Sequence, residues 1–283
     1  MSTIKPIQLI VTAIAGDHVE SLQLIPDFAS PHNYSFKPRD IKKIQNATLV
    51  FRIDEHFESF LNAALALNTQ EKQLISLAEE EGITLLSLEG DSHQHGHSDD
   101  HNESETDEHE EHNDDLHIWT SPKNALVIAK AISANLAKVD PQNASHYRKN
   151  LQQFTLDISL ANKKIGKKLS SVKNKHYVVF HNSWRYFAHF FGLESPEVIS
   201  LHEDLSDSMK SILDTRKKIK TMNITCVLSD PNTKLSRVNV LIEDLPVKTA
   251  SIDVLATKIK KSKNGYINWL EKMGNDIEHC LSD

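Results

Sequence analysis

The sequence predicts an α/β protein with two lobes, each built on a mostly parallel sheet flanked by helices, and one long helix joining them. Short strand-like runs alternate with helix-like segments in the first and last parts of the chain, which is typical of parallel sheets. Between them, apolar residues recur at helical spacing from Ala144 to about Ser170, over a length that suits a connecting helix. A chain of 283 residues is long enough for one large domain or two smaller ones.

The expected boundaries follow from this alternation. We expect an N-terminal α/β lobe at residues 1–140, a linking helix at 141–171 and a C-terminal α/β lobe at 172–283. In the first lobe, strands are expected at 18–25, 48–53 and 83–88, and helices at 7–15, 39–47, 57–67, 71–81 and 122–138. In the second lobe, strands are expected at 176–180, 197–200, 225–228 and 247–252, and helices at 183–191, 206–220 and 266–280.

The charges are unevenly distributed along the chain. The formal net charge is −7, yet residues 73–122 hold fifteen acids and no lysine or arginine. The remaining 24 acids and 32 bases give the rest of the chain a net charge of +8. We therefore expect an acidic loop inserted into a mildly basic body. The bases are scattered, without an arginine-rich arm, which argues against nucleic acid binding. No apolar run reaches the length of a membrane span.

The inserted tract at residues 89–115 has the composition of a metal-collecting segment. It holds twelve carboxylates and six histidines, which are His93, His95, His97, His101, His109 and His112. Imidazole and carboxylate are common ligands of divalent transition metals, and no lysine or arginine competes within the tract. This is a compositional signal without defined geometry. A solvated acidic loop is the alternative interpretation.

Three further histidines stand at predicted strand-to-helix transitions. His32 lies in a loop between two prolines, His117 lies just before the helix that begins at Pro122, and His181 directly follows the strand at 176–180. Ligands of open α/β sheets bind at the carboxyl ends of strands. A single histidine in such a place is more often structural. Three in equivalent positions, beside a histidine-rich tract, predict one convergent metal site.

The two cysteines leave two possibilities open. Cys226 lies in the strand-like run at 225–228, and Cys280 lies in the last predicted helix. A disulfide between them would close a long loop and stabilise the fold, whereas two unpaired buried thiols are expected in a reducing compartment.

Three motifs around the strand-end histidines resemble a known family. They are SPHNYSFKPRD at residues 30–40, DLHIWTSP at 115–122 and VVFHNSWRYFAHFFGL at 178–193. They are similar to the periplasmic zinc-binding members of the metal-specific (cluster A-I) substrate-binding proteins of ABC transporters. The resemblance extends over nearly the whole chain, through the segments at 226–231 and 250–255, and includes the position of the histidine–acid tract.

The resemblance implies a set of metal ligands. His32, His117 and His181 correspond to zinc ligands, and Asp253 stands where manganese-type relatives supply a carboxylate. Zinc favours four ligands, and a water often takes the fourth place in zinc-type members. Asp253 is therefore either a direct ligand or a hydrogen-bond partner of one. His181 replaces the glutamate of manganese-type relatives, and a nitrogen-rich site favours zinc. Some zinc-type members have glutamate where this chain has Pro31.

The resemblance also implies the function and its setting. We expect a high-affinity receptor that captures zinc in the periplasm and delivers it to an ABC transporter permease for import. The chain should be a monomer without catalytic activity or a small organic substrate. The family pairs the cysteines that correspond to Cys226 and Cys280. Because the chain begins without a signal peptide, we expect an export signal to have been removed.

Three alternatives remain at this level. The first is a receptor for manganese or another divalent metal within the same family. The second is a zinc hydrolase that uses Asp253 or Asp230 as its base, although no HExxH motif is present. The third is a metal buffer or adhesin that binds through the histidine–acid tract alone. His202 is either a surface histidine, which we favour, or part of a secondary site with this tract. His56 is expected at the surface or beside a ligand, and not as a ligand itself.

Overall fold

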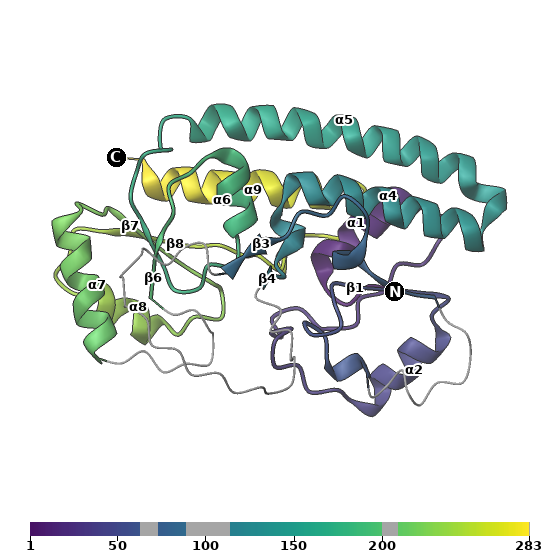
Figure 1. The fold of residues 1–283 in the computed structure, drawn as a ribbon, viewed down its shortest axis with the longest axis horizontal. Coiled ribbons are helices and arrows are strands. Elements are labelled where there is room, and N and C mark those ends of the chain that lie inside the picture. The colour runs from purple at the N-terminus through teal and green to yellow at the C-terminus, as the bar shows by residue number, and fades with distance from the viewer. Residues whose placement is uncertain (63–72, 89–113, 200–208, 283) are drawn as a thin grey trace, which may run out of the picture.

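The computed structural model describes residues 1–62, 73–88, 114–199 and 209–282. Its α-helices are α1 (Lys5–Ala15), α2 (Pro38–Asn46), α4 (Pro122–Val139), α5 (Ala144–Leu169), α6 (Arg185–Phe191), α7 (Met209–Thr221), α8 (Leu235–Ile242) and α9 (Gly265–Leu281). Its strands are β1 (Leu49–Arg52), β2 (Gln73–Ser76), β3 (Leu86–Ser87), β4 (Asp114–Asp115), β5 (Val178–Val179), β6 (Glu197–Val198), β7 (Cys226–Ser229) and β8 (Lys248–Ser251). Figure 1 shows how these elements are arranged.

The C-terminal sheet has the predicted parallel topology. Its four strands follow the order β6-β5-β7-β8, and every neighbouring pair is parallel. β5 is buried throughout and β7 over its first three residues, as expected for strands covered on both faces. Because parallel strands end at the same edge, the segments that follow β5 and β7 start side by side. Helix α8, in contrast, was not predicted.

The N-terminal sheet differs from the prediction at residues 71–81. The expected helix is wrong over its described part, because residues 73–76 form strand β2 and Leu77–Glu79 form a 3-10 helix. β2 pairs in parallel with β1, with Val50 opposite Leu74 and Phe51 opposite Ile75. A short apolar run fits a helix or a buried strand equally well by its period. Pairing with β1 decided between them.

The predicted strand at 18–25 is only partly formed. Its described contribution is an isolated parallel bridge between Gln23 and Ser2. Ser2 also bridges to Phe51, so the first residues of the chain lie between residues 22–25 and β1. Backbone N–H groups of Leu24 and Ile25 donate to the carbonyls of Ser2 and Thr3 at 2.9 and 3.0 Å. The extended start of the chain was missed, since only its tertiary neighbours distinguish it from a loop.

The strand expected at 83–88 is short and antiparallel. β3 pairs with β4, with Leu86 opposite Asp115 and Ser87 opposite Asp114. The histidine–acid tract begins and ends at this pair, which the sequence did not indicate. The six tract histidines themselves lie outside the described residues.

A layer of helices supports both sheets. The long helix predicted at 144–170 is confirmed as α5, which packs against α1, α4 and α9 (Figure 1). One hydrophobic core includes residues from α1, α4, α5 and α9, from Ile7 to Leu281. Because α9 packs against α1 as well as α5, the C-terminal helix reaches the N-terminal part of the molecule. The expected domain boundaries at 140 and 171 stay a prediction.

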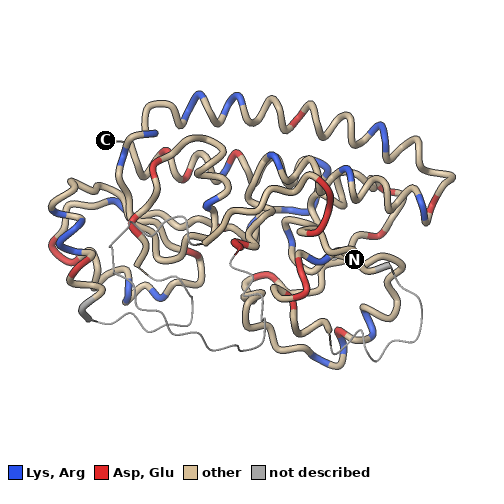
Figure 2. Tube along the Cα trace, in the orientation of Figure 1, with Lys and Arg blue, Asp and Glu red and all other residues tan. Residues whose placement is uncertain are grey.

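Basic residues are distributed over several helices, including α2, α5 and α7, as Figure 2 shows. No helix within the described ranges is both long enough and apolar enough to cross a membrane.

A disulfide joins the C-terminal sheet to the helical layer. Cys226 on β7 is bonded to Cys280 on α9, with their Cα atoms 5.5 Å apart, and both residues are buried. The pairing implied by the family resemblance is therefore confirmed. The bond fixes β7, whose carboxyl end leads to Asp230, to the last helix.

Removing this bond should destabilise the fold. The cysteines are 54 residues apart, and closing a loop of that length lowers the entropy of the unfolded chain by an amount worth about 4 kcal/mol. We expect Cys280→Ser to lower the free energy of unfolding by about 2–4 kcal/mol in urea titrations. The double variant Cys226→Ala/Cys280→Ala is the control and should lose a similar amount. Unchanged stability in both variants would contradict the assigned role.

Candidate metal centre

Three histidine side chains converge at one point. One ring nitrogen each of His32, His117 and His181 lies within 4.8 Å of the other two. Their ring centroids are 5.3 Å apart for His32–His117, 5.8 Å for His32–His181 and 5.0 Å for His117–His181. Tetrahedral zinc with Zn–N bonds of about 2.1 Å holds its nitrogens about 3.4 Å apart, so small side-chain movements would close the site. The structure thus brings together all three histidines named from the sequence.

Each histidine is placed by a different element. His117 follows β4 and precedes the 3-10 helix Ile118–Thr120, which leads into α4. His181 lies just beyond the carboxyl end of β5. His32 belongs to the loop that leads to α2. The side chains of His117 and His181 are only 12% and 13% exposed, whereas His32 is exposed. The site is therefore closed behind two histidines and open at the third.

The loop of His32 is anchored by a buried carboxylate. Asp40 on α2 accepts hydrogen bonds at Oδ2 from the Tyr34 hydroxyl at 2.8 Å and from the Lys37 backbone N–H at 3.0 Å. Asp40 itself is fully buried. These bonds hold the segment that follows His32 against the start of α2.

His117 is oriented by Asp115. The Asp115 Oδ1 atom lies 2.7 Å from His117 Nδ1 and accepts the His117 backbone N–H at 2.9 Å. A carboxylate at Nδ1 favours the tautomer with its proton there, which leaves the Nε2 lone pair for a metal. Burial by itself would raise the pKa of Asp115. The charge of His117 and the hydrogen bonds that His117 donates outweigh this effect, so the pKa lies below its ordinary value. The lowered pKa favours the ionised form of Asp115, which fixes the orientation of the His117 ring through these contacts.

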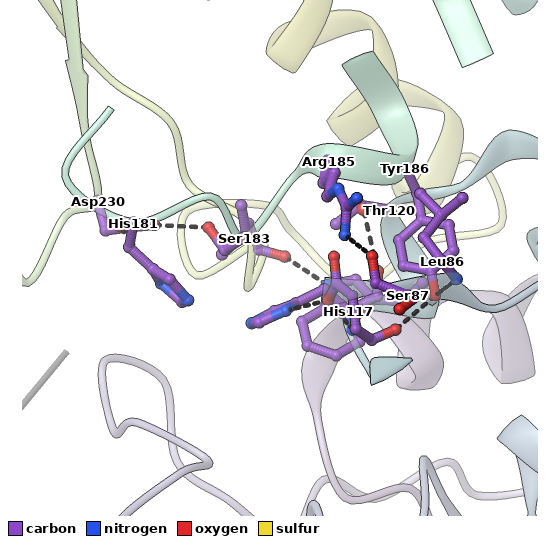
Figure 3. A network of polar contacts seen from close by, with 12 residues as sticks. Leu86, Ser87, His117, Thr120, His181, Ser183, Arg185, Tyr186 and Asp230 are labelled. Atoms are coloured by element: carbon purple, nitrogen blue, oxygen red, sulfur yellow. Dashed lines mark hydrogen bonds and ion pairs between the residues drawn. The ribbon is translucent and has the colours of Figure 1, made fainter. Parts of the chain in front are cut away.

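Two side chains of helix α6, Arg185 and Tyr186, hold the β3–β4 pair in place, as Figure 3 shows for their contacts with Ser87 and Leu86. The hydroxyl of Tyr186 donates to the Asp115 carbonyl and accepts the Leu86 backbone N–H at 3.0 Å. Burial raises the pKa of Tyr186, so its hydroxyl remains a donor. Arg185 Nη1 donates to the Ser87 carbonyl at 2.6 Å. The short β3–β4 pair is thus fastened to the element that follows His181.

His181 also has a carboxylate beside its ring. Its Nδ1 lies 3.8 Å from Asp230 Oδ2, and the Ser183 hydroxyl donates to Asp230 Oδ1 at 3.0 Å (Figure 3). Asp230 follows β7, the neighbour of β5 in the sheet. The parallel pairing of these strands therefore places the acid next to the histidine.

Two aromatic rings line the site. Phe57 is buried, and its ring centroid lies 5.0 Å from that of His32 and 6.0 Å from that of His117. Trp119 is fully buried, with its ring 5.2 Å from that of His117 and 5.5 Å from that of Phe57. These rings keep water away from one side of the histidines, which strengthens electrostatic interactions there.

Asp253 lies outside this group in the described part of the structure. Its Oδ2 accepts the Thr257 hydroxyl at 2.9 Å and the Lys258 backbone N–H at 3.1 Å. Its Oδ1 is buried and accepts no hydrogen bond from the described residues. The prediction that Asp253 supplies the fourth ligand remains a prediction.

Other histidines fall outside the centre. The side chain of His56 is 54% exposed, in keeping with its expected surface position, and its Nε2 lies 3.6 Å from Oε1 of the neighbouring Glu55. His202 lies outside the described residues, as do the six tract histidines.

Sequence reasoning missed Asp115, Phe57 and Trp119 as parts of the site, and it named Asp230 only as a base for a hydrolase. A local signal existed for Asp115, which stands two residues before His117. Asp230 directly follows β7, and His181 beside it stands two residues after β5. For Phe57 no such signal exists, because its contacts with His32 and Trp119 are all distant in sequence.

The fold and the gathered imidazoles define a class, that of α/β proteins built to hold a metal ion. The chain belongs to the ZnuA family, described as zinc-uptake complex component A, periplasmic, whose model matches residues 1–280. Relatives named high-affinity zinc uptake system protein ZnuA support this membership. The one from Haemophilus ducreyi is 33% identical, with 100% of this chain and 93% of the relative covered. The one from Yersinia pestis is 29% identical, with 99% and 90% covered.

Solved structures share the fold. A ZnuA crystal structure superposes with a TM-score of 0.82 at 24% identity, covering 99% of this chain and 98% of that one. A zinc-bound ZnuA deletion mutant gives 0.81 at 24% identity, covering 100% and 97%. A manganese-bound periplasmic protein from Candidatus Liberibacter asiaticus gives 0.78 at 18%, covering 99% and 98%.

The contact between Asp115 and His117 yields a prediction. Asp115→Asn keeps the size of the side chain but removes its charge, so His117 loses the group that fixes its proton on Nδ1. We expect zinc affinity, measured by competition with a chelator, to fall about tenfold. Asp114→Asn, one residue earlier on β4, is the matched control and should bind zinc as the unsubstituted chain does. Equal affinities for both variants would contradict the role of Asp115.

Proposed function

We propose that this protein is a high-affinity zinc receptor that captures zinc in the periplasm and delivers it to an ABC transporter permease. The observation that carries the proposal is the convergence of His32, His117 and His181, with one ring nitrogen each within 4.8 Å. It is supported by membership of a periplasmic zinc-uptake family and by relatives named for high-affinity zinc uptake.

The donor set supports zinc as the cargo. Three neutral nitrogens suit zinc better than manganese, which prefers oxygen ligands. The fold alone does not determine which metal is bound, since a manganese-bound protein has the same fold, with a TM-score of 0.78. Asp253 or a water would complete a tetrahedral shell. The buried Asp253 Oδ1, which accepts no hydrogen bond from the described residues, supports the carboxylate.

A metal held by three histidines and a fourth ligand can be bound without any catalytic reaction. Zinc held by protein ligands for transport needs no general base, and the two acids beside the ring nitrogens, Asp115 and Asp230, are engaged with His117 and Ser183. As a component of an uptake complex, the protein would meet its permease as a monomer. Release follows when the permease draws the ligand loops apart.

The histidine–acid tract is proposed to assist capture. Its ends are set by the β3–β4 pair, and Asp115 on β4 is two residues from His117. Zinc collected by the tract would therefore be handed over close to His117.

Two variants separate the main site from the tract. His181→Ala removes one of three nitrogens, and we expect tight zinc binding, measured by chelator competition, to fall by at least about a hundredfold. Replacing residues 91–113 with a short glycine linker keeps β3 and β4 and should leave tight binding intact, while weaker additional binding is lost.

His189→Ala is the matched control, because His189 is an exposed histidine on the neighbouring helix α6. It should bind zinc normally. Loss of tight binding with the tract, together with normal binding by His181→Ala, would sink the three-histidine site.

Zinc affinity should fall in acid. Histidine must be neutral to bind a metal, and its ordinary pKa is about 6.5. The pKa of Asp115 is lowered, so this acid stays ionised over the same range and does not reverse the trend. Between pH 7.5 and 5.5 we therefore expect zinc affinity to fall by at least about tenfold. Affinity that is equal at both pH values, measured with a pH-corrected chelator, would exclude histidine ligation.

A further inference from the structure

Lys5 occupies an unusual place at the start of α1. It is the first residue of this helix, where the positive end of the helix dipole disfavours a cation. Its side chain is nevertheless only 11% exposed. The ammonium donates to Asp27 Oδ2 at 2.8 Å and to the Thr257 carbonyl at 3.2 Å. The contacts with Asp27 and Thr257 offset the unfavourable interaction between the Lys5 ammonium and the helix dipole. They also connect two turns of the chain.

The first turn leads to His32. It spans residues 26–29 and is closed by the Ala29 N–H, which donates to the Pro26 carbonyl at 3.1 Å. Phe28 has φ 66°, in the left-handed region that residues with a β carbon disfavour. Such conformations persist where the surroundings hold them. Asp27 is held on both sides, because its Oδ1 accepts from Gln23 Nε2 at 3.2 Å.

The second turn carries Asp253. The Ala256 N–H donates to the Asp253 carbonyl at 3.2 Å, and Ala256 also has a left-handed φ, at 54°. Thr257, whose carbonyl accepts from Lys5, directly follows this turn, and its hydroxyl donates to Asp253 Oδ2 at 2.9 Å. Within the turn the Val254 carbonyl accepts from Trp119 Nε1 at 2.9 Å. The turn is thereby connected to Trp119, the ring that packs beside His117.

We infer that Lys5 is a positioning residue for zinc binding: its ammonium ties the turn that leads to His32 to the turn that carries Asp253. This inference rests on the proposed function. His117 and His181 lie beside carboxylates on the sheets, whereas His32 is on an exposed loop. Asp40 anchors that loop after His32, and Lys5 anchors it before His32. Without the ammonium, His32 is no longer held at a fixed distance from the other two rings.

The test compares lysine variants of the full chain. Lys5→Met keeps the apolar stem and removes the charge, Asp27→Asn removes the acceptor charge, and Lys5→Arg restores a cation. Lys261→Met is the matched control, because Lys261 donates to the Ser21 carbonyl at 3.2 Å and makes no hydrogen bond to either turn within the described residues. Zinc affinity is measured by chelator competition at less than one equivalent of zinc. The visible absorption of bound Co²⁺ reports the geometry of the site.

We expect Lys5→Met and Asp27→Asn each to lower zinc affinity about tenfold, as loss of a supporting contact does at metal sites. The double variant should lose no more than either single one, because both remove the same tether. Lys5→Arg should recover most of the affinity, and Lys261→Met should lose none. The Co²⁺ bands should change in Lys5→Met, which a general loss of stability would not cause in protein that remains folded.

Normal zinc affinity and an unchanged Co²⁺ spectrum in Lys5→Met would overturn the inference. An equal loss in Lys261→Met would overturn it as well. If the unsubstituted chain itself binds no zinc, the proposed function is refuted together with the inference. If the unsubstituted chain binds zinc and Lys5→Met binds it equally well, only the inference about Lys5 is refuted.

Discussion

The structure depends on one constraint, which is that three imidazoles from distant parts of the chain must meet at one point. A shift of a few ångströms in any of them would leave fewer than three nitrogens for one ion. His117 and His181 meet this constraint through strand ends, since β4 and β5 deliver them from fixed positions. His32 meets it through a loop held at both sides. The helical layer of α1, α4, α5 and α9 keeps these segments in register through a shared core.

A buried acid, Asp115, orients the ring of His117. Placing Asp115 away from water is unfavourable in itself, and its hydrogen bonds with His117 offset that penalty. The gain is a defined tautomer and a fixed ring orientation. Asp230 stands beside His181 in a comparable way, at a longer distance of 3.8 Å. Because α6 carries the groups that hold Asp115 and lies just after His181, the two histidine positions are mechanically connected.

Sequence patterns predicted the strongly periodic parts of the fold. The long helix at 144–170 was found because many turns share one apolar face, so its observed range Ala144–Leu169 differs little. β5 and β7 were found because each lies in a short, buried apolar run. The segment at 73–76 was assigned wrongly, since four residues carry too little periodicity to separate strand from helix. The first residues of the chain were missed for the same reason.

The sequence by itself indicated the type of ligand and the number of histidines that converge. Histidines after three predicted strands indicated a nitrogen-rich site, and the motifs around them indicated the family. Only the tertiary structure decided what surrounds them, namely Asp115, Asp230, Phe57, Trp119 and the Lys5 tether. The physical reason is that local patterns record which face of an element is buried. Contacts between side chains far apart in sequence, such as Lys5 with Thr257 at 3.2 Å, exist only once those elements have packed.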